Sequence, residues 1–368
     1  MTRPDVTVLI LTYERPSYLA RSLSFLRGKG LAVIVADGSN ISFDISMLDN
    51  LGPYFSYFHM PEVDYISRLK HISEKVETNF IIMLQDDGFL NPSGLHIAVK
   101  DLESNPELSG IIGKELSFRG EQDDVRYWLD SREGTSDANI YEGDLLSRVG
   151  EYFRVWYPRL LYSCIRAENF KRAVKILPNR NVYSIDFELL LEPHIELSVL
   201  IQGNVKKIPE VITYRSFENP SVRTLNDPRL KMGKLSSYQW LGHPEFSTEV
   251  SSYIYLFSML LPNQPCNYYH FCNHVLLMWA NERATETHRD NAPIFRWLSK
   301  LSRLSKSSRW AFLQLTRPSP VTKKLVNKML NKDVFLITWP EDECICRLNS
   351  LGIGNNVSEV SHHIRNCL

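Results

Sequence analysis

Two adjacent carboxylates, Asp86 and Asp87, follow the apolar run 80–84, Phe-Ile-Ile-Met-Leu, with only Gln85 between. Five consecutive apolar residues are typical of a strand that is buried on both faces of a sheet. In an open parallel sheet, ligands bind beyond the carboxyl ends of the strands, and this strand would deliver both acids to that edge. Carboxylate oxygens there can bind a divalent cation and the phosphates that it holds. An Asp after a strand also often caps the next helix, and this alternative stays open.

A second acidic pair, Asp186 and Glu188, occurs in the stretch 185–189, Ile-Asp-Phe-Glu-Leu. Displacement at the anomeric carbon of a sugar needs a carboxylate that takes the proton of the attacking hydroxyl. An apolar neighbour and partial burial would raise the pKa of such an acid toward a useful range. The alternative is a pair of acids in the first turn of a helix, where the helix dipole favours them.

These acids need a scaffold, and the preceding residues predict one. Apolar runs alternate with an amphipathic pattern and with polar breaks, which is typical of strand-helix-strand units with a parallel sheet. The predicted elements are strands at 6–12, 31–36, 54–59 and 80–84 and helices at 17–26 and 64–78. Further along, a helix at 91–104, a short strand starting at 110–113, a long loop or irregular hairpin over 117–151 and a last strand at 205–215 are expected.

The motifs on this scaffold resemble those of the GT-A glycosyltransferases. After the first strand comes Thr-Tyr-x-Arg-Pro (12–16), after the second Asp-Gly-Ser (37–39), and after the fourth Leu-x-x-Asp-x-x-x-x-Pro (84–92). In their order and spacing they are most similar to the inverting family 2 enzymes of bacterial surface-polysaccharide biosynthesis, over about residues 5–218. The resemblance implies a Rossmann-like α/β domain with a mostly parallel sheet, and a nucleotide-sugar donor.

The resemblance also implies which residues surround the donor. A tyrosine at a strand end can cover a base, and a carboxylate can accept a hydrogen bond from a base or ribose. The alternatives are that Tyr13 and Asp37 only form turns and that Arg68 lies on a solvated helix face. The implied donor-binding residues are Thr12, Tyr13, Arg15, Asp37, Arg68, Asp86 and Arg215.

The family pattern at the metal site is Leu-Asp-x-Asp, and this chain departs from it. Its second acid corresponds to Asp87, but Gln85 replaces the first, and Gln brings no charge to a cation. The resemblance still implies Mg²⁺ or Mn²⁺, with Asp87 as the first ligand and Asp86 as the second. The third ligand of some relatives, a His after the last strand, is missing, which leaves Arg215 to hold the diphosphate. In the family's Glu-Asp-aromatic-Glu-Leu pattern, Asp186 matches the base and Ile185 replaces the first acid. The resemblance thus implies that Asp186 is the catalytic base, with Glu188 in reserve.

The 368 residues predict a GT-A domain over 1–230 and a mainly helical C-terminal domain over 231–368. The segment 296–332 carries ten Lys and Arg and no Asp or Glu, in a chain of net charge zero. Trp and Leu between these cations favour a membrane surface, and packing against the acidic remainder is the alternative. No nucleic-acid-binding motif accompanies the charge. Six irregularly spaced Cys and no signal peptide or apolar span predict a cytoplasmic protein, at most peripheral to the membrane.

The predicted function is therefore transfer of a sugar from a nucleotide-sugar donor to a glycan or lipid-linked glycan acceptor, with inversion. A retaining GT-A enzyme remains an alternative, because one fold hosts both outcomes. A non-catalytic sugar-nucleotide-binding or scaffold protein is another, because Gln85 and Ile185 replace two acids of the family. A nucleotidylyltransferase would need a Gly-rich loop after the first strand, and residues 11–15 contain no Gly.

Overall fold

The computed structural model describes most of the first 217 residues and the end of the chain. The described residues are 4–48, 51–121, 124–129, 140–141, 160–177, 188–217, 339–350 and 357–367, together with Leu145, Arg148 and Tyr152. The basic segment 296–332 and the predicted domain boundary at 230/231 lie outside them, so both stay predictions.

Four parallel strands form the centre of one large sheet, in the order β4-β1-β2-β3. They are β1 (Val6–Thr12), β2 (Ala32–Asp37), β3 (Phe55–His59) and β4 (Phe80–Leu84). All five residues of β4 are buried, as expected for an apolar run between two layers of helices. The register pairs Thr12 with Asp37, so the carboxyl ends of β1 and β2 lie at the same edge.

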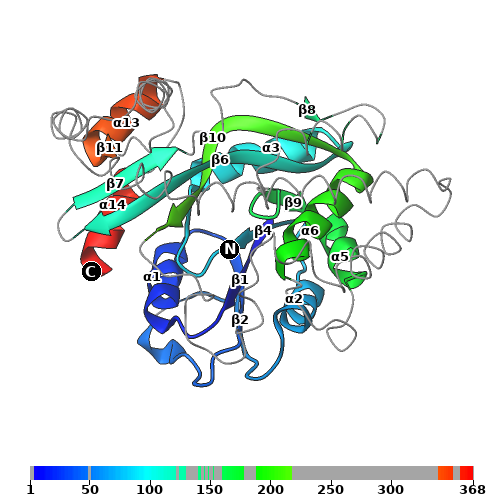
Figure 1. Ribbon diagram of the computed structural model, residues 1–368, viewed down its shortest axis with the longest axis horizontal. Helices are drawn as coiled ribbons and strands as arrows, with labels where there is room; N and C mark the ends of the chain where they lie inside the picture. Colours follow the sequence, from blue (N-terminus) through cyan, green and yellow to red (C-terminus); the bar gives the residue numbers. More distant parts are fainter. Residues whose placement is uncertain are drawn as a thin grey trace, which may run out of the picture.

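Helices cover both faces of this centre (Figure 1). One apolar layer joins the sheet to α1 (Pro16–Leu26) and α3 (Pro92–Ser104), and the other joins it to α2 (Tyr65–Glu74), α5 (Ala167–Lys175) and α6 (Glu188–Gln202). Local sequence sets where two of these helices begin. The Asp64 carboxylate accepts from the amides of Ile66 and Ser67, and the Asn91 side chain accepts from that of Ser93. The fold is α/β with a mostly parallel centre, which confirms the prediction and agrees with a GT-A domain.

Beyond β4 the sheet becomes mixed. The strand β9 (Cys164–Arg166) lies antiparallel between β4 and β6 (Leu108–Glu121), and β6 continues to β7 (Asp124–Leu129) and β11 (Trp339–Pro340). The long strand β10 (Asn204–Ser216) runs parallel to β6 and also pairs with β5 (Phe89–Leu90) and β8 (Ile140–Tyr141). A short 3₁₀ turn, η1 (Ile45–Met47), completes the described elements before β3.

The main error of the sequence analysis concerns β6. A short strand starting at 110–113 was predicted, but β6 has 14 residues. Its hairpin with β7 falls in the stretch 117–151, where a long loop or irregular hairpin was expected. The glycines at the two ends of the predicted 110–113 segment are sites of close packing. A Cβ at Gly113 would lie 2.3 Å from Ile212 Cγ1, and one at Gly110 would lie 2.9 Å from Leu160 Cδ1. The helix predicted over 64–78 also ends early, at Glu74.

The end of the chain packs on the first domain. Helices α13 (Glu341–Ser350) and α14 (Val357–Cys367) share an apolar core with α1, β6 and β7, and Figure 1 shows α14 beside α1. The Tyr127 hydroxyl lies 2.6 Å from Ser361 Oγ, and His363 Nε2 lies 2.7 Å from the Arg21 carbonyl oxygen. Helices α13 and α14 therefore belong structurally with the α/β domain. Within the described ranges, no helix is both long and apolar enough to cross a membrane.

A buried histidine makes stability depend on pH. His194 is fully buried on α6 against α5, with Nε2 3.2 Å from the Ala173 carbonyl oxygen, and burial lowers its pKa to about 3. Between about pH 6.5 and pH 3 the unfolded chain binds the extra proton, so stability falls with falling pH by up to about 1.4 kcal/mol per unit. We expect His194→Gln to flatten this slope in urea unfolding at several pH values. His96→Gln, at an exposed position, should keep it, and equal slopes in all three proteins would contradict the prediction.

Candidate active site

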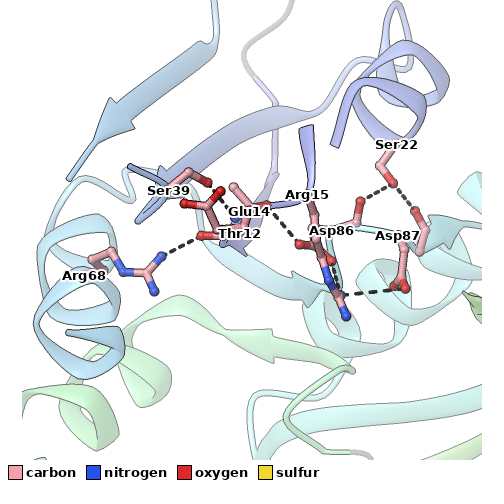
Figure 2. Close-up of polar contacts among 9 residues, drawn as sticks. Thr12, Glu14, Arg15, Ser22, Ser39, Arg68, Asp86 and Asp87 are labelled. Atoms are coloured by element: carbon pink, nitrogen blue, oxygen red, sulfur yellow. Dashed lines mark hydrogen bonds and ion pairs between the residues drawn. The ribbon is translucent and has the colours of Figure 1, made fainter. Parts of the chain in front are cut away.

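The carboxyl ends of β1, β2 and β4 bring together residues that are far apart in sequence. Thr12 ends β1, and Asp86 and Asp87 follow β4 (Figure 2). Asp37 ends β2. The Thr12 hydroxyl donates to Asp86 Oδ2 at 2.9 Å, which joins the ends of β1 and β4 directly. The convergence predicted for this edge of the sheet is present, and all four side chains are largely buried.

A guanidinium group lies against the acidic pair. Arg15 Nη1 donates to Asp86 Oδ1 at 2.9 Å and lies 3.9 Å from Asp87 Oδ2. The side chains of Arg15, Asp86 and Asp87 are only 15%, 6% and 9% exposed, so the charges interact away from most of the solvent. Burial raises the pKa of Asp86, and the positive charge of Arg15 and the Thr12 hydrogen bond oppose that rise.

The turn that carries the acids is held by main-chain contacts. Ser22 Oγ lies 2.9 Å from both the Asp86 and the Gly88 carbonyl oxygens, and the Gly88 amide donates to the Gln85 carbonyl at 3.0 Å. A Cβ at Gly88 would lie 3.1 Å from the Tyr214 carbonyl oxygen, which favours glycine there. The sequence analysis missed Ser22. A hydroxyl within the buried stripe of α1 was the available signal, because a buried hydroxyl needs a partner.

The next contact anchors the turn to β10. The Asn91 amide donates to the Ile212 carbonyl and its side chain to the Val211 carbonyl, both at 2.8 Å. A Cβ at Gly94 would lie 2.1 Å from the Val211 carbonyl oxygen, so α3 can approach β10 this closely only with glycine at this position. The acids therefore stand on a rigid support.

Two hydrogen bonds fix the orientation of the Asp37 carboxylate. Its Oδ1 accepts from the Ser39 amide at 2.8 Å, and its Oδ2 accepts from the Tyr57 hydroxyl at 2.6 Å. Burial and the neighbouring Asp37 raise the pKa of Tyr57, which keeps this hydroxyl a donor. A ligand would meet a carboxylate of fixed orientation here, and the predicted role of Asp37 at the nucleotide stays a prediction.

The Arg68 side chain is buried next to the carboxyl ends of β1 and β2. Its Nη1 donates to the Thr12 carbonyl at 2.7 Å and lies 3.3 Å from the Ala36 carbonyl oxygen, and Figure 2 shows it reaching toward Thr12. A Cβ at Gly38 would lie 2.6 Å from Arg68 Cζ, so the Asp-Gly-Ser glycine makes room for this guanidinium. The alternative of a solvated helix face is wrong, because Arg68 is only 5% exposed.

The loop after β1 is tied to the loop after β2 through Glu14. Its amide donates to Ser39 Oγ at 2.7 Å (Figure 2), and its Oε1 accepts from the Asn40 amide at 2.8 Å. Glu14 has a φ of +55°, a left-handed conformation that is uncommon outside glycine. Such strain is frequent where a loop must present its neighbours in one geometry. The neighbours here are the half-buried Tyr13 and Arg15.

A second group of polar residues lies on the other side of Gln85. The Gln85 side chain forms a hydrogen bond with Tyr162, whose hydroxyl donates to Glu192 Oε1 on α6 at 3.3 Å. Burial and the charge of Glu192 raise the pKa of Tyr162, and the positive charge of Arg215 on β10 opposes that rise. Arg215 itself lies 3.9 Å from Glu115. No motif pointed to Tyr162 or Glu192, and their only signal was polarity within largely apolar segments.

The predicted base cannot be placed in this geometry. Asp186 lies outside the described residues, and Glu188 is the first residue of α6. Glu192 follows Glu188 by one helical turn and faces Tyr162, so this end of α6 approaches the end of β4.

The side chains at 85–87 do not fit a divalent cation as they are arranged. One carboxylate oxygen of Asp86 accepts from Arg15 and the other accepts from Thr12, and the Gln85 side chain forms a hydrogen bond with Tyr162. Across the described ranges, no three His, Cys, Asp or Glu side chains form a group that could hold a metal ion. The Mg²⁺ or Mn²⁺ ion stays a prediction, and no step of the chemistry below depends on it.

Comparison with known proteins gives similarity to solved structures only. No protein-family model matches the chain, and no curated protein does. The crystal structure of S. aureus TarS is 12% identical with a TM-score of 0.49, over 90% of this chain and 53% of TarS, so the chain spans about half of that protein. The crystal structure of S. aureus TarS 1–349 in complex with UDP-GlcNAc is 14% identical with a TM-score of 0.48, over 83% and 78% of the two chains. At such identities and TM-scores, these similarities do not assign this chain to a family.

Proposed function

We propose that this chain is a glycosyltransferase that moves a sugar from a nucleotide-sugar donor to a glycan or lipid-linked glycan acceptor. The observation that carries the proposal is the contact between Thr12, Arg15 and the acids Asp86 and Asp87 at the carboxyl ends of β1 and β4. In an α/β sheet this edge is where nucleotides bind, and the site combines a phosphate-binding guanidinium with fixed carboxylates.

In the proposed complex, the nucleotide lies along the ends of β1 and β2. Asp37 is oriented by Tyr57 and Ser39 to accept from the ribose or base, and Tyr13 covers the base from the loop after β1. Arg15 meets the diphosphate from one side. Arg215 on β10, near Tyr162, meets it from the other side.

The proposed reaction is a direct displacement with inversion at the anomeric carbon. The acceptor oxygen forms its bond as the bond between that carbon and the diphosphate oxygen breaks, and Asp186 takes the acceptor proton. The guanidinium groups stabilise the charge that develops on the departing diphosphate. The approach of α6 to Gln85 through Tyr162 and Glu192 supports a position for Asp186 near this edge, because Glu188 starts that helix.

A sugar-nucleotide-binding protein without catalysis is the second candidate. It is favoured by Gln85, which replaces an acid and is bonded to Tyr162, so it is held by the protein itself. Both candidates predict donor binding, but only an enzyme releases nucleoside diphosphate from the donor. We further propose that the segment 296–332 binds a membrane surface, because its ten cations suit anionic lipids, and that the acceptor is bound there.

The test is a thermal-shift screen of the diphosphates of uridine, guanosine, cytidine, adenosine and thymidine, each with and without Mn²⁺. A ligand that binds only the folded chain must raise the melting temperature, and we expect one base to do so selectively. The sugar donors of that base are then incubated with the protein, and released diphosphate is measured. No shift with any nucleotide would end the proposal, and a shift without release would favour the second candidate.

A further inference from the structure

The carboxylates of Asp86 and Asp87 already lie next to a positive charge, the guanidinium of Arg15. Arg15 Nη1 is 2.9 Å from Asp86 Oδ1 and 3.9 Å from Asp87 Oδ2, so it lies against both carboxylates. Its side chain remains 15% exposed, more than either acid, and so it lies on the solvent side of the group. A ligand entering from solvent at this edge therefore meets the guanidinium before it meets the carboxylates.

Two further groups of the motif also contact neighbouring side chains. Asp86 Oδ2 accepts from Thr12 at 2.9 Å, and Gln85 is bonded to Tyr162. A Mg²⁺ ion demands a nearly octahedral set of oxygens at about 2.1 Å, and it would have to displace Arg15 to use Asp86 Oδ1. It would also stand within a few ångströms of a second positive charge, which lowers its affinity further.

We infer that Arg15 takes the place of the divalent cation: its guanidinium binds the donor diphosphate, and the donor binds without a metal ion. The inference rests on the proposed function and deepens it. A planar guanidinium matches phosphate oxygens in pairs, and the two acids fix its orientation before the ligand arrives. Arg15 is also the N-cap residue of α1, whose first turn carries no acid, so the peptide dipoles of that turn add positive potential at the same place.

The substitution of Gln85 fits this arrangement. A second carboxylate at that position would add charge for binding a cation, whereas a site with one guanidinium needs less negative charge around it. With Gln in place of Asp, the group holds two acids against one fixed cation. The bond from Gln85 to Tyr162 gives the neutral side chain a structural role instead.

The experiment measures binding of the same five nucleoside diphosphates to the full chain after removal of metals, in excess EDTA and in excess Mn²⁺, by titration calorimetry. For wild type we expect dissociation constants that agree within about threefold in the two conditions. In EDTA, the Arg15→Gln variant should bind the diphosphate about tenfold or more weakly, because it loses charge-assisted hydrogen bonds to the phosphate oxygens. Arg172→Gln, on an exposed pair with Glu168 far from the site, is the matched control and should bind as wild type does.

Each outcome decides the inference. Wild-type binding that appears only with Mn²⁺ overturns it while leaving the proposed function intact. Undiminished binding by Arg15→Gln in EDTA also overturns it. Absence of binding in both conditions overturns the proposed function and the inference with it. The wild-type comparison needs no variant, so it stands even where Arg15→Gln folds poorly.

Discussion

Asp87→Asn is expected to lower kcat/KM for sugar transfer by about 100-fold or more, with little change in melting temperature. The reason is geometric. Asp87 Oδ2 lies 3.9 Å from Arg15 Nη1, the same nitrogen that donates to Asp86 Oδ1 at 2.9 Å. Removing its charge leaves Arg15 bonded to Asp86 but no longer held between two acids. The loss should appear as slower release of nucleoside diphosphate from the donor, measured under saturating and limiting donor.

The neighbouring acid provides the contrast. Asp86 accepts from Thr12 and from Arg15 at 2.9 Å and is almost wholly buried. Asp86→Asn should therefore lower the free energy of unfolding by about 1–3 kcal/mol in addition to lowering activity, because it leaves a largely buried guanidinium with a weaker acceptor. Asp44→Asn, at the exposed cap of η1, is the control and should change neither quantity. Full activity in Asp87→Asn would remove this acid from the site.

The sequence predicted the centre of the fold well because its signals there are local. β1 and β4 are continuous apolar runs, and such runs have few stable solutions other than a strand buried on both faces. Pro16 and Pro92 mark the starts of α1 and α3, and the Asn91 side chain caps α3. The edge where Thr12, Asp37 and Asp86 converge follows from the parallel connection of these strands, so that edge was predictable as well.

The contacts that define the chemistry were not predictable, because they join distant residues. Arg15 and Asp86 are 71 positions apart, and the motif alone placed Arg15 at the nucleotide without indicating that it pairs with the acids. Tyr162 and Glu192 meet through a turn and a helix that carry no motif. The full length of β6 did not follow from local signals, because Gly113 lies inside the strand, where it provides space for Ile212 on the neighbouring strand. Tertiary contacts, and not local propensity, decided each case.

Asp186→Asn is expected to lower kcat by about 1000-fold while leaving the dissociation constant of the nucleoside diphosphate unchanged. A base acts on the acceptor hydroxyl and does not hold the donor, so its loss should separate binding from transfer. The measurement pairs calorimetric binding of the diphosphate with the rate of transfer, and with the much slower release of diphosphate to water. Binding that weakens together with transfer would assign Asp186 to the donor side of the site.

Two other acids could take the proton, and matched amides distinguish them. Glu188→Gln tests the reserve, at the start of α6, and Glu192→Gln tests the acid that accepts from Tyr162 at 3.3 Å. Because Tyr162 connects Glu192 to Gln85, loss of the Glu192 charge should lower the rate of transfer by about tenfold or less, through altered positioning. If Glu192→Gln instead abolishes transfer and Asp186→Asn does not, the base is the acid beside Tyr162. The proton would then leave along the side of the site that Gln85 borders, and the direction of acceptor approach would change accordingly.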